Sequence, residues 1–384
     1  MMRILQMPIR NAKGGITQYA LQNWSYIDKK RFMFDWVTLD KELSFEKELI
    51  EQGCKVFHLS CRQEDDEVQF RNEMRAIIDD GYDAIHLHTS FWRGFLAEEL
   101  ALAANIPKII VHAHSTGIDN SNAEKRTRLL RIHEDWKRKF NIGLATNLIA
   151  CSENASNFLF GEQIPSERII ILRNGIDTRK FEYYEDIREK TRKLLGVENK
   201  IVLLQTGRLE YQKNYEFTLD MFADYVKLNQ NAVLLIVGHG SMEQELIKKA
   251  EPLGDKVKFL GFRSDIPQLL MAADVFLQPS HFEGFSLASI EAQCSGISWL
   301  VSEAVPKYAL PLSEERLPLH KAVLPLHKAV WIDMLKKITD NHVRNDYAGK
   351  QLRDMGWDIN DSIKKLENVY SGDNVFVGKE RVEF

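Results

Sequence analysis

Short apolar runs rich in β-branched residues alternate along the chain with longer segments in which apolar residues recur every three or four positions. The short runs predict buried strands, and the longer ones predict helices with one buried face. The first half predicts strands at residues 3–7, 35–39, 55–59, 84–88, 108–112 and 147–150. The second half predicts strands at residues 201–206, 233–237, 257–260 and 275–278. Amphipathic segments between them include residues 92–104, 215–228 and 242–250. This alternation favours an α/β fold in which helices cover both faces of parallel sheets.

Two such sets of strands predict two doubly wound domains, because 384 residues exceed what one hydrophobic core usually serves. We place the boundary at Asn174-Gly-Ile-Asp177, since an Asn-Gly pair favours the positive φ of a tight turn. The first domain then spans residues 1–175, and the second begins at residue 176.

Composition is that of an ordinary globular protein, with 44% hydrophobic and 28% charged residues. A net charge of -4 argues against nucleic acid as a partner. The four cysteines show no CxxC spacing, so we expect neither a disulfide framework nor a zinc site. With no long apolar segment, a cytoplasmic location is expected.

Ligands of open parallel sheets bind at the carboxyl ends of the strands. Glycine-containing or polar segments follow several predicted strands, at residues 11–15, 112–115, 207–214, 238–240 and 281–287. These five segments are therefore the candidate binding loops.

Two glutamates flank the start of a predicted helix in the string Glu283-Gly-Phe-Ser-Leu-Ala-Ser-Ile-Glu291. Glu291 shares a helical stripe with the apolar residues Leu287, Ile290 and Cys294. Carboxylates are seldom buried without a partner, so we expect Glu291 to have a polar one. A partly exposed helix flank is the alternative interpretation.

The segment Gly207-Arg-Leu-Glu-Tyr-Gln-Lys-Asn214 follows one predicted strand and precedes a helix. Arg208 offers a planar fork and Lys213 a compact cation, which together suit a diphosphate at a helix N-terminus. Two solvated surface cations are the alternative. Gly14-Gly15 and Gly238 follow other strands and allow backbone to approach a ligand closely, although any tight turn could use them.

His112 and His114 end one predicted strand and point to the same side. A metal pair would need a third ligand, and none is apparent nearby. His86 and His88 repeat the spacing one strand earlier, so core packing is the default for most of the four. If one acts in chemistry we favour His114, which is nearest the loop.

Residues 124–140 form a basic amphipathic segment with interleaved apolar positions. Such a helix suits an anionic lipid surface, and a solvated helix with a buried stripe is the alternative. A perfect tandem duplication occupies residues 317–330, and a recent local duplication explains it better than a binding repeat.

Taken together, the early Gly-Gly, the strand-end histidine, the Asn-Gly-Ile-Asp turn, the Arg208–Lys213 loop and the paired glutamates resemble a large family of retaining glycosyltransferases. That family includes bacterial mannosyl- and polysaccharide-building transferases. The resemblance implies the GT-B architecture, two Rossmann-like domains facing across a donor cleft. It also implies that the second domain ends at residue 345 and that residues 346–384 supply a helix crossing back to the first. After the second glutamate the family usually has a proline, which Ile297-Ser-Trp-Leu300 lacks, and the match is poor from residue 306 to 330.

The resemblance implies roles for individual residues. Arg208 and Lys213 would hold the donor diphosphate, Glu291 would accept the ribose hydroxyls, and Glu283 would contact the donor sugar. The remaining donor contacts that it implies are Gly14, Gly15, His114, Gly207, Gly238, Phe262, Arg263, Phe285, Ser286 and Leu287.

The implied activity is retaining, metal-independent transfer from a nucleotide-diphospho-sugar, a UDP-sugar by preference. The acceptor would be a saccharide or lipid-linked saccharide, in exopolysaccharide or capsule assembly, with the enzyme peripheral on the inner face of the membrane. No cofactor is expected. The alternatives are a sugar-nucleotide epimerase or phosphorylase on the same fold, or a non-catalytic partner subunit of a glycosyltransferase.

Overall fold

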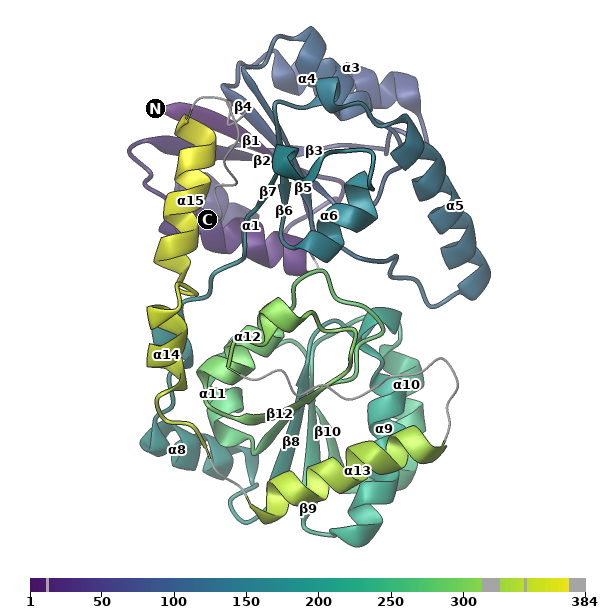
Figure 1. Cartoon of the computed structure of the whole chain (residues 1–384), viewed down its shortest axis with the longest axis vertical. Helices are drawn as coiled ribbons and strands as arrows, with labels where there is room; N and C mark the ends of the chain where they lie inside the picture. The colour runs from purple at the N-terminus through teal and green to yellow at the C-terminus, as the bar shows by residue number, and fades with distance from the viewer. Residues whose placement is uncertain (12–13, 313–324, 342–343, 373–384) are drawn as a thin grey trace. The chain divides into compact units, whose positions relative to one another are not determined.

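The computed structural model describes residues 1–11, 14–312, 325–341 and 344–372 (Figure 1). Contacts divide the chain into two compact units. The first contains Met1–Ile118, Glu124–Gly175 and Ile359–Phe384, and the second contains Asp119–Ala123 and Ile176–Asp358.

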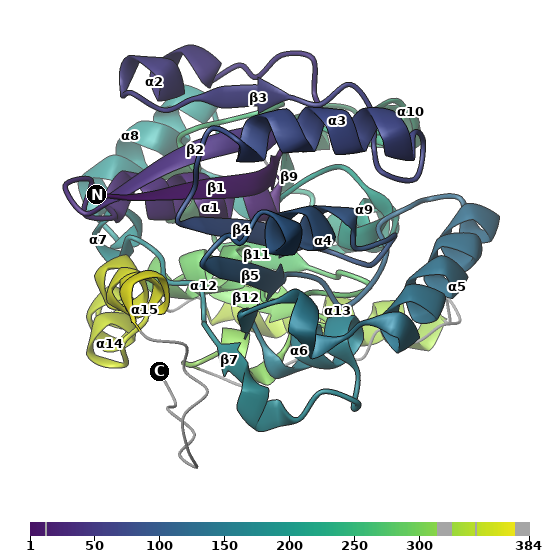
Figure 2. The same ribbon diagram turned by 90° about the horizontal axis from the view of Figure 1, so that it is seen from above.

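The first unit is built on a seven-stranded parallel sheet in the order β3-β2-β1-β4-β5-β6-β7, and Figure 2 labels all of these strands except β6. Its strands are β1 (Met2–Ile9), β2 (Phe32–Thr38), β3 (Val56–His58), β4 (Ala84–Thr89), β5 (Lys108–Ala113), β6 (Asn147–Ala150) and β7 (Ile169–Ile171). The chain reverses direction across the sheet between β1 and β4, which makes their carboxyl ends the topological switch point.

Helices cover both faces of this sheet, because each strand is followed by an amphipathic crossover. They are α1 (Gly15–Tyr26), α2 (Glu46–Glu51), α3 (Glu67–Ile78), α4 (Leu96–Ala103), α5 (Ala123–Lys139), α6 (Glu153–Phe160) and α15 (Ile359–Ser371). Polar side chains cap the N-termini of α3 and α6. The side chain of Asp66 accepts a hydrogen bond from the backbone N–H of Gln69, and that of Ser152 accepts one from the backbone N–H of Ala155.

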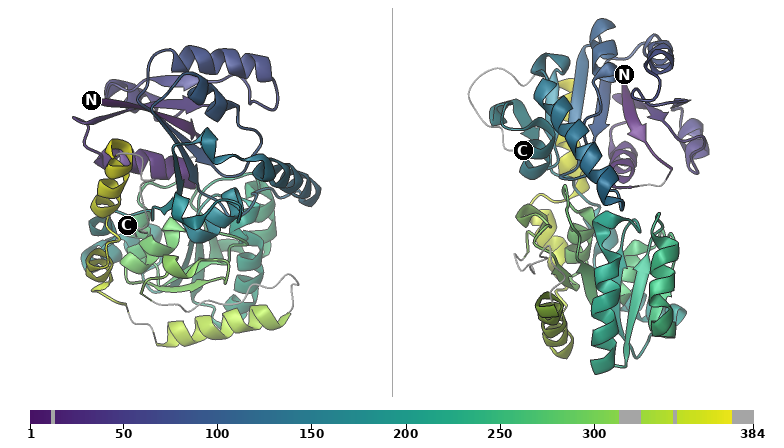
Figure 3. Two further views of the ribbon diagram at one scale, coloured as in Figure 1. Left: turned by 45° about the horizontal axis from the view of Figure 1, so that its top comes forward. Right: turned by 90° about the vertical axis from the view of Figure 1, so that its right-hand side faces the viewer.

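The second unit has a five-stranded parallel sheet in the order β10-β9-β8-β11-β12, with helices on both sides (Figure 3). Its strands are β8 (Ile201–Thr206), β9 (Ala232–Val237), β10 (Val257–Phe259), β11 (Val275–Gln278) and β12 (Ser298–Val301). Its helices are α7 (Thr178–Phe181), α8 (Glu185–Leu195), α9 (Tyr215–Leu228), α10 (Glu243–Ala250), α11 (Ile266–Ala272), α12 (Leu287–Cys294), α13 (Pro325–Asp340) and α14 (Ala348–Asp354). The order repeats that of the first sheet, so the switch point lies between β8 and β11.

A buried carboxylate anchors α8 to the sheet of the second unit. Asp274 precedes β11 and accepts hydrogen bonds from Arg188 at 2.5 Å and from the backbone N–H of Val202 at 2.8 Å. Arg192 lies 3.3 Å away on the same helix. These donors lower the pKa of the Asp274 carboxyl against the opposing effect of burial, so its charge stays compensated.

All ten predicted strands are present, and the predicted fold class is confirmed. The prediction missed two edge strands, β7 and β12. Residues 346–358, expected to cross with the last helix, belong instead to the second unit, because α14 packs against α7 and α12. The crossing helix is α15, which packs against α1.

The duplicated segment at 317–330 lies mostly outside the described residues, and its second copy continues into the start of α13. Across the described part of the chain, no helix combines the length and the apolar character that crossing a membrane requires.

Candidate active site

The loop after β8 holds the two predicted cations at the switch point of the second unit. Gly207 has a φ of +139°, and a short 3₁₀ turn (Tyr211–Lys213) leads through Asn214, in the left-handed region, into α9. Gly238, after β9, approaches so closely that a Cβ there would stand 1.9 Å from the carbonyl oxygen of Gly207. Packing between the two loops therefore already accounts for the glycine at position 238.

Lys213 and Glu283 form a largely buried ion pair between the loops that follow β8 and β11. The Lys213 Nζ lies 2.7 Å from Glu283 Oε1, and Glu283 is only 5% exposed. The same carboxylate accepts hydrogen bonds from Gln278 Nε2 at 2.8 Å and from Ser280 Oγ at 2.7 Å. These three donors fix the Glu283 side chain at the switch point, although Lys213 and Glu283 are 70 positions apart.

Arg208 also has a carboxylate partner, Asp119, which sequence reasoning did not identify. Its guanidinium lies 2.8 Å from Asp119 Oδ2, while Asp119 Oδ1 accepts a hydrogen bond from the backbone N–H of Gln212 at 2.9 Å. Burial raises the pKa of the Asp119 carboxyl, and the charge of Arg208 opposes that rise. The only signal in the sequence is an aspartate soon after the strand-end histidines, which is weak.

Glu291 lies on α12 in the stripe that the sequence predicted, beside the buried Ile290 and Cys294. Within the described residues no hydrogen bond or ion pair reaches its half-buried carboxylate, so the expected polar partner is not found in that part of the chain. Burial raises the pKa of Glu291 to about 7, against a weaker opposing effect of the Lys213 charge. A ligand with hydroxyl donors would supply what the fold leaves out.

A strained residue starts α12. Ser286 has a φ of +76°, which is uncommon for a side chain other than glycine, and caps the helix by accepting from the backbone N–H of Ser289. Its hydroxyl lies 2.7 Å from Gln278 Nε2. Phe285 is buried against Tyr308 and Trp357, so it anchors the loop, and Leu287 is the first residue of the helix.

The loop after β10 carries Phe262 and Arg263, the two donor contacts that the resemblance implies beside the nucleobase. Phe262 is 55% exposed. Arg263 is bound through two nitrogens to its neighbour Asp265, at 2.7 Å and 2.6 Å. Arg263 is therefore turned toward its own loop, and the exposed Phe262 ring is the better surface for stacking.

In the first unit, Gly14 and Gly15 begin α1 directly beside residues 12–13, which are outside the described part. Gly14 has extended backbone angles, and no side chain caps the helix. Apart from its chain neighbours and its own helix, none of the described residues places an atom within 4 Å of where a Cβ at Gly15 would stand. Packing therefore does not require glycine at position 15, whereas close approach by a ligand would.

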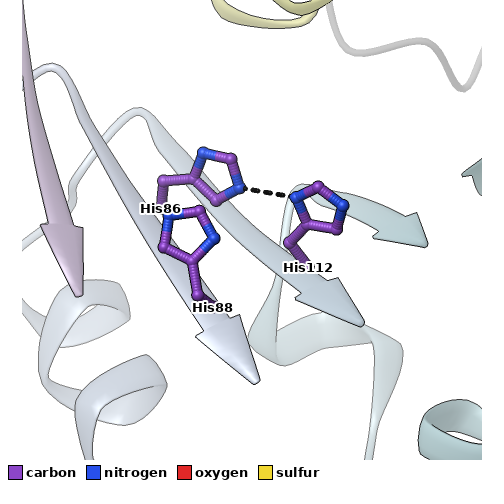
Figure 4. Close-up of side chains that lie close together, drawn as sticks. All are labelled: His86, His88 and His112. Atoms are coloured by element: carbon purple, nitrogen blue, oxygen red, sulfur yellow. Dashed lines mark hydrogen bonds between the residues drawn. The ribbon is translucent and has the colours of Figure 1, made fainter. Parts of the chain in front are cut away.

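Four histidines, two in β4 and two in or directly after β5, gather on one face of the first sheet. His86 Nε2 lies 3.1 Å from His112 Nδ1, and ligand atoms of His86, His88 and His112 fall within 4.8 Å of one another (Figure 4). His86 and His88 of the neighbouring strand thus lie close enough to His112 to supply the further ligand atoms that the sequence analysis did not find nearby. Both ring nitrogens of His86 are engaged, because His86 Nδ1 also lies 2.7 Å from Tyr370 Oη.

His114, at the strand end, is less buried than the other three and lies 2.9 Å from His88 through its Nε2. Burial and the neighbouring His88 hold the pKa of His114 well below its usual value, so its ring is neutral at physiological pH. A neutral imidazole can donate from one nitrogen and accept at the other.

Comparison with known families agrees with this geometry. A sequence model described as Glycosyltransferase Family 4 matches residues 13–180, and one described as Glycosyl transferases group 1 matches residues 186–309. The chain is 27% identical over 387 residues to a Bacillus subtilis (strain 168) protein assigned as the glycosyltransferase EpsF, with 96% of each chain covered. It is 25% identical over 388 residues to the Escherichia coli UDP-Gal:alpha-D-GlcNAc-diphosphoundecaprenol alpha-1,3-galactosyltransferase, again covering 96% of each chain.

Among solved structures, HepE of Anabaena in complex with UDP and glucose superposes with a TM-score of 0.74 at 20% sequence identity. The match covers 97% of this chain and 100% of that one. The two family models match the two halves of the chain, and the fold is shared over nearly its whole length, so the chain is similar throughout to glycosyltransferases and has the GT-B architecture.

Proposed function

We propose that this glycosyltransferase moves a sugar, with retention of anomeric configuration, from a UDP-sugar to a saccharide or lipid-linked saccharide acceptor in surface polysaccharide assembly. The observation that carries the proposal is the group of charges at the β8–β11 switch point. Arg208 and Lys213 are held there by Asp119 and Glu283, with Glu291, which has no partner among the described residues, on the adjoining helix.

Each part of this group fits one part of the donor. The two cations would bind the diphosphate, displacing or sharing the carboxylates that now hold them. The Glu291 carboxylate would accept hydrogen bonds from two ribose hydroxyls, and Glu283 would orient the sugar. His114 and the Gly14-Gly15 helix start of the first unit, with the amides of Phe285, Ser286 and Leu287, are the further donor contacts we propose. Gly207 shapes the cation loop, and Phe262 would stack on the base.

The reaction would need no enzyme nucleophile. As the bond between the anomeric carbon and the diphosphate oxygen breaks, negative charge grows on the leaving UDP, and Arg208 and Lys213 would stabilise it. The acceptor oxygen would attack from the same face, and its proton would pass to the departing phosphate oxygen, so that UDP leaves as the new glycosidic bond forms. The two cations would supply the positive charge that other enzymes draw from a divalent metal.

The proposed UDP-sugar donor and lipid-linked acceptor rest on the Escherichia coli relative, whose name gives a UDP-sugar and an undecaprenol diphosphate-linked acceptor. We propose a cytoplasmic enzyme that reaches such an acceptor at the inner face of the membrane. The basic helix α5 is the surface we propose for that contact.

The packing of α5 limits how it could bind lipid. Its apolar side is already used: Leu129 is buried, Trp136 stacks edge-on against Phe95, and Phe140, just beyond the helix, packs on Trp92. The outward face keeps the cations, so binding would be electrostatic, with no insertion of an apolar stripe.

A nucleotide-sugar panel tests the proposal. Thermal unfolding should show stabilisation by UDP and by one UDP-sugar above the others, because a ligand that binds only the folded state raises the midpoint. With that donor and an acceptor, UDP release should be stoichiometric with a product whose anomeric configuration, read by NMR, equals that of the donor.

Other outcomes would overturn it. An inverted product would remove the retaining mechanism. Conversion of the donor without acceptor would favour an epimerase, and dependence on inorganic phosphate would favour a phosphorylase. Donor binding without any turnover over a wide acceptor range would favour a non-catalytic partner subunit.

A further inference from the structure

A continuous chain of hydrogen bonds connects α15 to the end of β5 through buried side chains of the first unit. Gln6 Nε2 donates to Tyr370 Oη at 3.0 Å, and Gln6 Oε1 lies 2.8 Å from His88 Nε2. His88 Nδ1 in turn lies 2.9 Å from His114 Nε2. Gln6 and Tyr370 are 1% exposed and His88 is 3% exposed, so water does not interrupt the chain.

The amide of Gln6 gives this chain a direction. A carbonyl oxygen only accepts, so the hydrogen between Gln6 and His88 belongs to His88 Nε2. Neutral His88 then has no hydrogen on Nδ1, which must accept from His114 Nε2. His114 in turn has no hydrogen on Nδ1.

The second branch from Tyr370 follows the same logic. Its hydroxyl accepts from Gln6, so its hydrogen is directed to His86 Nδ1 at 2.7 Å. His86 then donates from Nε2 to His112 Nδ1 at 3.1 Å, and the remaining nitrogen, His112 Nε2, is buried with no partner among the described residues. All four histidines therefore have their hydrogens set by the orientation of one glutamine amide.

Protonation does not disturb this arrangement near neutral pH. Burial lowers the pKa of His88 to about 3 and holds the pKa of His86, His112 and His114 well below the usual value. The ring of Tyr19 from α1 packs edge-on against His88 and His112 and keeps the rings in place.

We propose that Gln6 and Tyr370 are positioning residues that lock His114 in the Nε2–H tautomer, so that its Nδ1 is presented as a hydrogen-bond acceptor for a hydroxyl group of the bound sugar. The inference rests on the proposed function in one respect, that His114 contacts the donor sugar. Within the described chain, His114 Nδ1 has no protein partner, whereas Nε2 is engaged by His88.

The tautomer can be read directly by long-range ¹H–¹⁵N NMR of protein labelled on histidine, with the signals of His114 assigned by their loss in His114→Gln. Wild-type protein near pH 7.5 should show a protonated Nε2 and an unprotonated Nδ1. A reversed Gln6 amide would place the hydrogen on Nδ1, and that spectrum, or an equal mixture of tautomers, would overturn the inference whatever the activity.

Two variants separate positioning from packing. Gln6→Leu should give averaged tautomer signals at His114, and Tyr370→Phe, which keeps the ring but frees the Gln6 amide, should do the same. Val369→Ala, one position earlier in α15 and equally buried, should lower stability and leave the His114 signals unchanged. If both test variants keep the wild-type tautomer, the chain does not set it.

Binding measurements then connect the tautomer to the donor. Tyr370→Phe should weaken the binding of the intact UDP-sugar about twofold to tenfold, which is the range for one hydrogen bond, and should leave the binding of free UDP unchanged. If His114→Gln leaves donor binding unchanged, the proposed sugar contact fails, while the NMR result still tests the tautomer. An equal loss for UDP and UDP-sugar would contradict a role directed at the sugar.

Discussion

Lys213 and Glu283 neutralise each other 2.7 Å apart at the ends of β8 and β11, in a place where the glutamate is almost wholly removed from solvent. A diphosphate that binds Lys213 would have to compete with this carboxylate. The donor-free site therefore holds balanced charge, and removing either partner leaves the other one buried and uncompensated.

The first prediction separates catalysis from stability at the two cations. Lys213→Ala and Arg208→Ala should each reduce turnover about 100- to 1000-fold, since each would remove one stabilising contact to the leaving diphosphate. Lys213→Ala should also lower the free energy of unfolding by about 1–3 kcal/mol, because Glu283 loses its charged partner. Arg208→Ala should lower it by less than about 1 kcal/mol, because that guanidinium is 40% exposed.

Initial rates of UDP release and urea unfolding measure both quantities. Lys227→Ala on α9 is the matched control, as it removes an exposed cation paired with Asp224 outside the site. Near-normal turnover of either folded site variant would contradict the assignment of the phosphate contacts.

The second prediction divides the roles of the two glutamates. Glu291→Gln should weaken the binding of free UDP about tenfold or more, because the ribose hydroxyls would lose a charged acceptor. Glu283→Gln should leave the binding of free UDP unchanged and weaken the binding of the intact UDP-sugar. Titration calorimetry of both variants with UDP and UDP-sugar tests this, and parallel losses in the two variants would refute the division.

The third prediction follows from the raised pKa of Glu291, about 7 in the folded protein against about 4.5 in an unfolded chain. The folded state binds a proton more tightly, so this carboxyl favours folding below pH 4.5 and progressively destabilises the protein as pH rises toward 7. Glu291→Gln should therefore be more stable than wild type at pH 8, by at most about 3 kcal/mol, and the gain should shrink as the pH falls and vanish below pH 4.5.

The affinity of the wild-type protein for UDP-sugar should increase as pH rises, whereas its stability should decrease. UDP-sugar binding needs the ionised carboxylate, so wild-type affinity should rise up to about tenfold from pH 6 to pH 8, while the affinity of Glu291→Gln stays flat. Thermal melts and calorimetry over this range check both statements, and an unfolding midpoint of the variant that tracks wild type at every pH would contradict them.

Much of the fold is predictable from the sequence, because strands buried in a parallel sheet consist of nearly continuous runs of apolar residues. β8 and β11 were predicted with their observed bounds, and α9 likewise. β7 was missed because its three isoleucines are half-buried at a sheet edge, and β12 because the polar Ser298 interrupts a short apolar run.

Of the candidate site, the sequence predicts the residues in the loops at strand ends, but not the long-range pairs that they form. Arg208, Lys213 and Glu283 follow from the switch point, because β8 and β11 are neighbours. Asp119 could not be paired with Arg208 from a separation of 89 positions, nor Gln6 with Tyr370 across 364. Such pairings depend on the register of the strands and on where α15 docks, which local patterns do not encode.

The fourth prediction concerns the strained start of α12. Ser286→Ala should lower the free energy of unfolding by about 1 kcal/mol, because the helix loses its cap while the positive φ remains. Ser286→Gly should lower the free energy of unfolding by less, because glycine adopts a positive φ without strain. Urea unfolding compares them, with Ser371→Ala at the end of α15 as a control, and equal losses at Ser286 would show that φ carries no strain.

The last prediction concerns the exposed face of α5. We would reverse Arg131, Arg138 and Lys139 to glutamate, and leave Lys137 in place because its side chain is only 15% exposed and pairs with Glu134. The triple variant should sediment less with anionic vesicles, since each cation near such a surface contributes about 1 kcal/mol, and the difference should fade as salt rises.

Reversing Lys336, Lys337 and Lys350 of the second unit gives the same change in net charge and should have a smaller effect. Activity on a short soluble acceptor should be unchanged in both variants. If wild-type protein ignores anionic vesicles even at low salt, α5 is a solvated face, and the acceptor must be soluble or be delivered by a membrane-bound partner.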